Sequence, residues 1–184
     1  AFADAQIGRI IEELRASGQI DNTMIIFIQG DNGSTAEGGP NGLLFEQSQI
    51  NGLHEDLQYQ VSRIDDIGGD KVYPVFPAAW GWAMNTPFQY YKRVASHLGG
   101  IRNGMVISWP ERIKDNGAIR SQFHHVADIM PTVLEAAHMT ALTSVDGVPQ
   151  KPLDGVSLAY SFDAPSARSH RTTQVFEMMN NYAI

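Results

Sequence analysis

Two stretches of the chain carry side chains whose types and spacing could do chemistry. The first is Gly30-Asp31-Asn32-Gly33, which follows directly on an apolar run. A carboxylate and an amide carbonyl are the oxygen donors that calcium and magnesium prefer, and flanking glycines let the backbone bring both side chains to one point. The same composition is also typical of an Asx-turn. From these residues alone, a metal site and a simple turn both stay open.

The second stretch contains Lys92 and His97, five positions apart and followed by Gly99-Gly100. A lysine ammonium suits an oxyanion as a point charge, and a nearby histidine can donate or accept a proton. The alternative is that Lys92 belongs to a solvated face and that His97 is a hydrogen-bonded structural residue. Taken by itself, this stretch favours the structural alternative.

The elements that would position these residues predict an α/β arrangement. Residues 3–17 carry apolar side chains at helical spacing with Gly18 as a C-terminal stop, which predicts an amphipathic helix. Residues 23–28 form an apolar, partly β-branched run, typical of a parallel strand covered on both faces. Because ligands collect at the carboxyl ends of such strands, Asp31 would lie at a binding edge of the sheet.

Further elements are predicted from hydrophobic periodicity and from the positions of glycine and proline residues. Residues 30–52 show no period and are predicted to form a long loop, followed by a short helix that ends at Gly68-Gly69. The segment after Lys71 is predicted to be irregular, and residues 105–109 to form a second strand.

The second half of the chain contains one more clear helical stripe. Asp128 is predicted to be its N-cap, which places Pro131 in the first turn, where the missing N–H does no harm. A short element at 156–162 and a strand at 173–178 complete the prediction.

Composition excludes several classes of function. The net charge of −7, from 20 acidic and 13 basic residues, argues against nucleic acid as a partner, because phosphate binding needs a basic face. No apolar run approaches the roughly 20 residues of a membrane helix, so no membrane partner is predicted. Absence of cysteine excludes disulfides, zinc-thiolate sites and a thiol nucleophile, and leaves bacterial cytoplasm and periplasm equally open.

Four segments in this order resemble the type I sulfatases of the alkaline-phosphatase superfamily. They are "IIFIQGDNG", "TPFQYYKRVASHLGGIRNGMVISWP", "FHHVADIMPTVLEAA" and "DGVSLAYSF". The resemblance is nearest to the large bacterial arylsulfatases. It implies part of an alkaline-phosphatase-like α/β sandwich with a mainly parallel central sheet flanked by helices. Residues 1–138 would be the middle-to-late part of the catalytic domain, and 139–184 a linker and the start of the C-terminal region.

The resemblance also implies roles for single residues. Asp31 and Asn32 match the family's metal-binding pair, with Ca²⁺ expected and Mg²⁺ as the alternative. Lys92 matches the lysine that contacts the sulfate and the leaving oxygen. His97 is a candidate catalytic residue, although many members carry a glutamate where this chain has Leu98.

Two further histidines recur in the family before the long helix. His124 and His125 occupy these positions, and we expect a structural role for both.

The family makes its nucleophile, a formylglycine, from a cysteine or serine in a Cys/Ser-x-Pro-x-Arg motif, and we expect no residue of this chain to stand in that motif. The nucleophile is therefore expected to lie outside this chain, together with the aspartates that complete the metal shell. We therefore expect an internal piece of a sulfatase, inactive in isolation, whose partners are its missing N-terminal half and a small-molecule sulfate ester. One rival function is a phosphodiesterase or phosphonate hydrolase of the same superfamily. Another is a non-catalytic domain that binds an anion or a protein.

Overall fold

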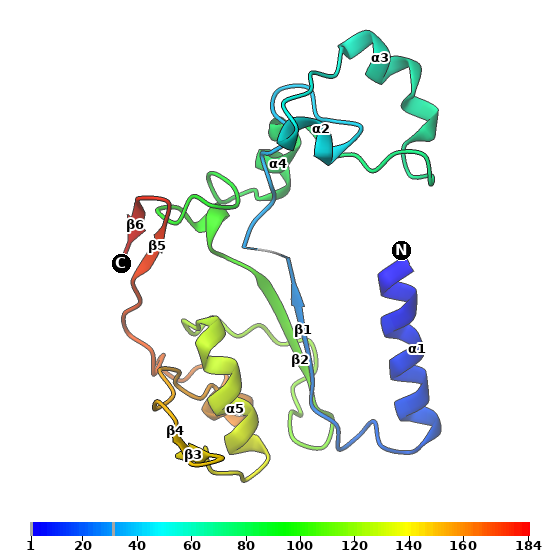
Figure 1. The fold of residues 1–184 in the computed structure, drawn as a ribbon. Coiled ribbons are helices and arrows are strands. Elements are labelled where there is room, and N and C mark those ends of the chain that lie inside the picture. Colours follow the sequence, from blue (N-terminus) through cyan, green and yellow to red (C-terminus); the bar gives the residue numbers. More distant parts are fainter. Residues whose placement is uncertain (1, 31) are drawn as a thin grey trace. The chain divides into compact units, whose positions relative to one another are not determined.

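The computed structural model describes residues 2–30 and 32–184 (Figure 1). Two compact units make up the chain: unit 1 contains the described residues up to Phe27 together with Val106–Gln174, and unit 2 contains Ile28–Met105 and Val175–Ile184. Neither unit ends at the boundary proposed between residues 138 and 139, which stays a prediction. No helix among the described residues has the length and apolar character needed to cross a membrane.

The first predicted helix is confirmed. Helix α1 spans Phe2–Ala16 and ends through Gly18, whose φ of +70° suits a glycine, while the N–H groups of Gln19 and Ile20 donate to the carbonyl oxygen of Leu14 at 2.9 and 3.1 Å. No described residue of α1 is buried. Of the stripe that predicts this helix, Ile7 and Ile10 are exposed, while Ile11 and Leu14 are only partly covered.

The strands predicted at 23–28 and 105–109 are both confirmed as strands. Strand β1 spans Ile25–Gln29, strand β2 spans Gly104–Ser108, and the two form a two-stranded sheet. The pair is antiparallel, because Gly104 lies beside Gln29 while the Trp109 indole N–H donates to the Asn22 side chain at 3.1 Å.

The predicted burial of the first strand is not found. Phe27 and Ile28 are 40% and 41% exposed, and each sheet of the described residues has two strands. The parallel central sheet is therefore not seen in this part of the chain. An apolar run indicates which residues suit burial, but it does not determine which elements cover them.

Unit 2 contains two helices in segments that the sequence predicts to be irregular. Helix α2, Glu46–Ile50, lies in the predicted loop, and α4, Ala78–Met84, in the proline-rich segment. Hydrophobic periodicity does not predict α2, because contacts from outside the helix stabilise its N-terminal end. The Glu55 carboxylate accepts the N–H groups of Leu44 and Phe45 at 2.6 and 3.0 Å.

Other elements of unit 2 are short. Helix α3 spans Leu57–Ser62, within the segment predicted as a short helix, and 3₁₀ turns follow at Ile64–Asp66 and Leu98–Gly100. Strands β5, Phe176–Met178, and β6, Asn181–Ala183, form an antiparallel hairpin. Side chains of Leu44, Val72 and Ala95 are buried.

In unit 1, a 3₁₀ turn at Val126–Asp128 leads into helix α5, Ile129–Ala136. The predicted capping role of the Asp128 side chain is wrong, since its carboxylate makes no cap bond to α5. It accepts the backbone N–H groups of His125 at 2.8 Å and Val156 at 2.7 Å, and it pairs with the guanidinium of Arg171. Asp128 therefore joins three segments of unit 1.

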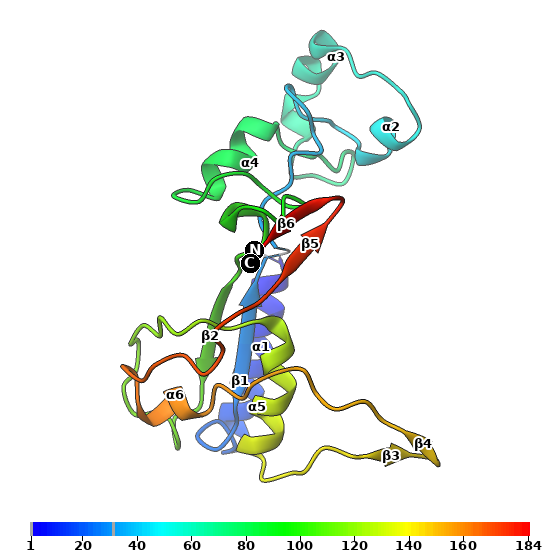
Figure 2. The same cartoon turned by 90° about the vertical axis from the view of Figure 1, so that its left-hand side faces the viewer.

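The rest of unit 1 packs around this ion pair. Thr132 accepts the N–H of Leu158 at 2.9 Å, just before helix α6, Tyr160–Asp163. Strands β3, Ser144–Val145, and β4, Val148–Pro149, form an antiparallel hairpin that extends away from α5 in Figure 2.

Candidate functional site

Three described residues of the turn that follows β1 have positive backbone φ angles. Gly30, Asn32 and Gly33 adopt φ values of +109°, +43° and +93°, a region in which glycine and asparagine are the favoured residues. Asp31 lies outside the described residues. Asn32 itself is half-buried. The two glycines thus serve the conformation that the sequence predicts for them.

This turn packs directly against the segment that carries Lys92. A Cβ added to Gly33 would lie 1.9 Å from the carbonyl oxygen of Gly99 and 3.1 Å from the Lys92 backbone nitrogen. The Lys92 N–H donates to the carbonyl oxygen of Ser34 at 2.9 Å. The structure therefore places the Lys92 backbone beside the residues that directly follow Asn32, and a shared site for the two side chains stays a prediction.

Asn85 holds the junction together. Its side-chain oxygen accepts the N–H of Ser34 at 3.0 Å, and its amide nitrogen donates to the carbonyl oxygens of Tyr90 at 2.9 Å and Gly99 at 3.0 Å. Sequence reasoning missed Asn85, since its Ser34 partner is 51 positions away. No local sequence pattern predicts a contact between residues so far apart.

Replacing Asn85 by alanine in the complete polypeptide is expected to lower the free energy of unfolding by about 1–3 kcal/mol, because two carbonyls and one N–H lose their partner. Denaturant titration measures the change. Asn41→Ala, at an exposed position of unit 2, is the matched control with an expected change within about 0.5 kcal/mol. Equal losses in the two variants would contradict the role of Asn85.

The backbone around Lys92 packs so closely against Gly99 and Gly100 that neither position has room for a side chain. A Cβ on Gly99 would lie 2.2 Å from the Tyr90 carbonyl oxygen, and one on Gly100 would lie 2.2 Å from that of Val94. Arg93, at a φ of +78°, pairs with Glu37 downstream of the turn. Gly99-Gly100 is thus a packing requirement of the Lys92 segment.

His97 has a different environment from Lys92. Its Nδ1 lies 2.9 Å from the Ser96 hydroxyl oxygen, and its ring centroid is 4.2 Å from that of Tyr90. These contacts fix the orientation of the imidazole against an aromatic ring. None of the contacts described for His97 involves Asn32.

His124 and His125 lie in unit 1, beside the Asp128 ion pair. The Nδ1 of His125 accepts the N–H of Ala127 at 3.2 Å, which makes His125 the cap of the turn before α5. Burial lowers the pKa of His124; the charge of Asp128 raises it by less, and Arg171 lowers it further. The contacts of His125 support the structural role expected for this pair.

Metal-binding side chains are sparse in what the structure describes. Among residues 2–30 and 32–184 no group of three or more histidines, aspartates or glutamates is placed to hold a metal ion. The Asn32 side chain could offer one amide oxygen, whereas calcium takes six to eight oxygen ligands. A metal-binding role of Asn32 therefore stays a prediction.

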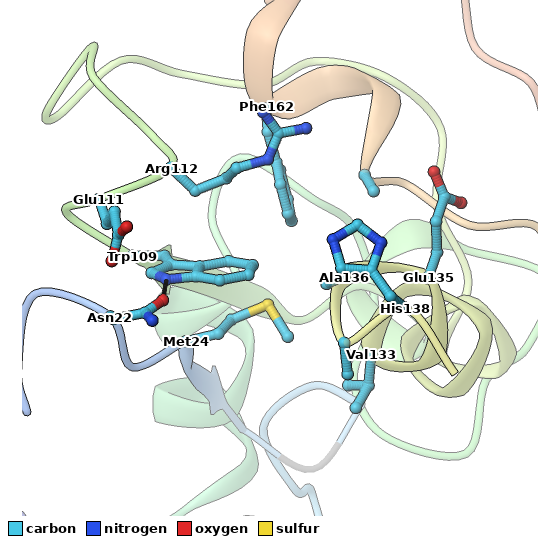
Figure 3. A pocket seen from close by; sticks show the side chains of 12 residues that line it. Asn22, Met24, Trp109, Glu111, Arg112, Val133, Glu135, Ala136, His138 and Phe162 are labelled. Carbon is cyan, nitrogen blue, oxygen red and sulfur yellow. Dashed lines mark hydrogen bonds between the residues drawn. The ribbon is translucent and has the colours of Figure 1, made fainter. Parts of the chain in front are cut away.

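A pocket in unit 1 involves other residues. It is lined by Trp109, Met24, Arg112 and Phe162 among others, and Figure 3 shows the Trp109 indole bonded to Asn22 at its edge. None of the predicted site residues lines this pocket.

The chain contains one serine with the Ser-x-Pro-x-Arg spacing, contrary to the expectation that it has no precursor for a formylglycine. This serine is Ser108, with Pro110 and Arg112 following. It is the last residue of β2 and precedes Trp109, whose indole N–H donates to the Asn22 side chain. The expectation that no serine of the chain has this spacing is therefore wrong.

Comparison with known proteins identifies the wider group. A family model described as "Sulfatase" matches residues 1–139. The chain is 29% identical to an arylsulfatase of Klebsiella aerogenes over 159 residues, which are 86% of this chain and 32% of that protein. It is 30% identical to an uncharacterised sulfatase of Schizosaccharomyces pombe over 136 residues, 74% of this chain and 23% of the relative. The chain thus spans a third or less of these two relatives.

Proposed function

Because this chain belongs to the sulfatase family, we propose that it forms part of a sulfuric ester hydrolase, an arylsulfatase, and supplies metal-binding and sulfate-binding side chains. The observation that carries the proposal is the junction at which the Lys92 N–H donates to Ser34 O at 2.9 Å. A turn suited to a cation and a lysine suited to an oxyanion meet there. That combination favours a tetrahedral oxyanion as the ligand.

Family membership implies the alkaline-phosphatase-like α/β fold. We infer that further strands of a mainly parallel sheet, from the N-terminal half of the same protein, cover β1 and α1. The exposure of Phe27 and Ile28 and the chain's 32% share of the Klebsiella relative support this inference. Residues 139–184 would lead into the C-terminal region.

Lys92 would act on the charge of the reacting group. Its compact ammonium can stabilise negative charge on the sulfuryl oxygens and on the leaving oxygen. In a site that excludes water, a positioned donor stabilises such charge far more strongly than it would in bulk water. The bond to Ser34 and the packing against Gly33 hold its backbone in place before substrate binds. Such preorganisation removes the cost of reorienting the donor during the reaction.

Asp31 and Asn32 would hold a Ca²⁺ ion, with Mg²⁺ as the alternative, which supplies positive charge to the sulfate oxygens when it is bound. The formylglycine of the family would come from outside this chain and supply the nucleophile. Asn32 would contribute its amide oxygen from a turn whose glycines fix the backbone.

His97 is the candidate for a role in proton transfer at the leaving oxygen. Its Nδ1 is engaged with Ser96 at 2.9 Å and its ring packs on Tyr90, so Nε2 is the nitrogen left to face a substrate. The same contacts support a positioning role, in which the imidazole fixes the Tyr90 ring beside Lys92.

Hydrolysis of 4-nitrophenyl sulfate by the complete protein tests this proposal. We expect turnover in the presence of calcium that exceeds turnover of bis(4-nitrophenyl) phosphate and of a phenylphosphonate monoester, and none from the 184-residue chain by itself. A preference for the phosphorus substrates would support the phosphodiesterase alternative. Absence of all three activities, in protein whose formylglycine has been verified by mass spectrometry, would support a non-catalytic binding domain.

A further inference from the structure

Four aromatic side chains of unit 2 form a connected group, which we call the aromatic cluster: Trp82, Tyr90, Tyr91 and His97. The Trp82 ring centroid lies 5.5 Å from that of Tyr90 and 6.0 Å from that of Tyr91. Tyr90 in turn lies 6.3 Å from Tyr91 and 4.2 Å from His97. These separations are those of interacting rings in tilted and edge-to-face arrangements.

The aromatic cluster is built on the two segments that contact the turn after β1. Helix α4 approaches at Gly81, where an added Cβ would lie 2.3 Å from the carbonyl oxygen of Thr35, and Trp82 is the next residue. Tyr90 and Tyr91 directly precede Lys92, whose N–H is bonded to Ser34. The rings therefore belong to residues that flank Lys92 in the chain or pack against the segment after the turn.

Two of these rings are held firmly and remain accessible. Tyr90 adopts a φ of +64°, which is unfavourable for a bulky residue, and its carbonyl oxygen accepts the Asn85 side chain at 2.9 Å. Backbone strain of this kind persists where the surroundings fix it, and it gathers at binding sites. Trp82 and Tyr90 are nevertheless 42% and 39% exposed.

We propose that the aromatic cluster is a subsite for the organic group of the sulfate ester and that it selects an aromatic ring through Trp82 and Tyr90. The inference rests on the proposed function, because Lys92 must hold the sulfate for the ring to reach the cluster. The ring of the ester would then face the cluster, whose neighbouring side chains offer ring faces and edges. Such contacts favour an aromatic group over a short alkyl group.

The test compares two sulfonates that share an anionic head and differ in the ring: benzenesulfonate and methanesulfonate, as competitive inhibitors of the complete sulfatase. We expect Trp82→Leu and Tyr90→Leu to raise the inhibition constant of benzenesulfonate about three- to tenfold and to leave that of methanesulfonate within twofold. Tyr90→Phe, which keeps the ring, should retain the affinity of the unmodified protein.

Trp80→Leu is the matched control, because Trp80 lies on the same helix, is 63% exposed and is not a member of the cluster. Equal losses for both sulfonates, or the same change in the control, would overturn the inference. Should the leucine variants fail to fold, equal affinity of the unmodified protein for the two sulfonates would overturn it as well. A protein that hydrolyses no sulfate ester contradicts the proposed function, whereas one that does so without preference for a ring contradicts this inference alone.

Discussion

Replacement of Lys92 by alanine in the complete sulfatase is expected to lower kcat/KM for an aryl sulfate by about 10²–10³-fold. The ammonium would stabilise charge that develops on the sulfuryl and leaving oxygens, and loss of one preorganised donor to such an oxyanion has effects of this size. Backbone contacts with Ser34 and Gly33 do not depend on the side chain, so the loop should stay in place. Steady-state kinetics with 4-nitrophenyl sulfate measures the effect.

The conservative variant sharpens this test. Lys92→Arg keeps the charge but spreads it over a planar group, and we expect activity between those of the parent and the alanine variant. Lys114→Ala is the control, because Lys114 is exposed and its ammonium donates to the Pro110 carbonyl oxygen at 2.9 Å. If Lys92→Ala retained activity within threefold of the control at unchanged thermal stability, the assigned role of Lys92 would be wrong.

Arg171→Met is expected to destabilise the complete protein by about 3–5 kcal/mol. The side chains of Arg171 and Asp128 are 9% and 1% exposed, and the substitution leaves a buried carboxylate without its counter-charge. Denaturant unfolding measures the loss. Arg112→Met is the control, because Arg112 pairs with Asp163 at 3.0 Å on the surface, where both side chains are more than half exposed and an ion pair contributes less than about 1 kcal/mol.

This pair also gives stability a defined dependence on pH. Burial raises the pKa of Asp128, but hydrogen bonds from Arg171, Val156 and His125 outweigh it and lower the pKa from 3.8 to about 2. Because the folded pKa is the lower one, the stabilisation is complete above about pH 4 and is lost as the pH falls toward 2. Arg171→Met should flatten this part of the stability profile. An unchanged profile, or a loss no larger than in the Arg112 control, would contradict the account.

Local pattern in the sequence was enough for several elements. The helical stripe and Gly18 predicted α1 to within one residue at each end, and apolar runs predicted β1 and β2. The glycines around Asn32 indicated a turn, and the positive φ angles of Gly30 and Gly33 agree with it because such angles are a property of single residues. The four ordered segments indicated the sulfatase family, and the match over residues 1–139 confirms it.

Other features were decided by the tertiary structure, because they depend on partners far apart in sequence. Helix α2 begins where Glu55 binds the preceding backbone, and Asn85 joins segments 51 positions apart. Asp128 has the sequence context of a cap, yet a buried arginine 43 positions away and two backbone N–H groups take its carboxylate. A short polar side chain can bond to whichever donor or acceptor reaches it, and only the folded backbone decides which one does.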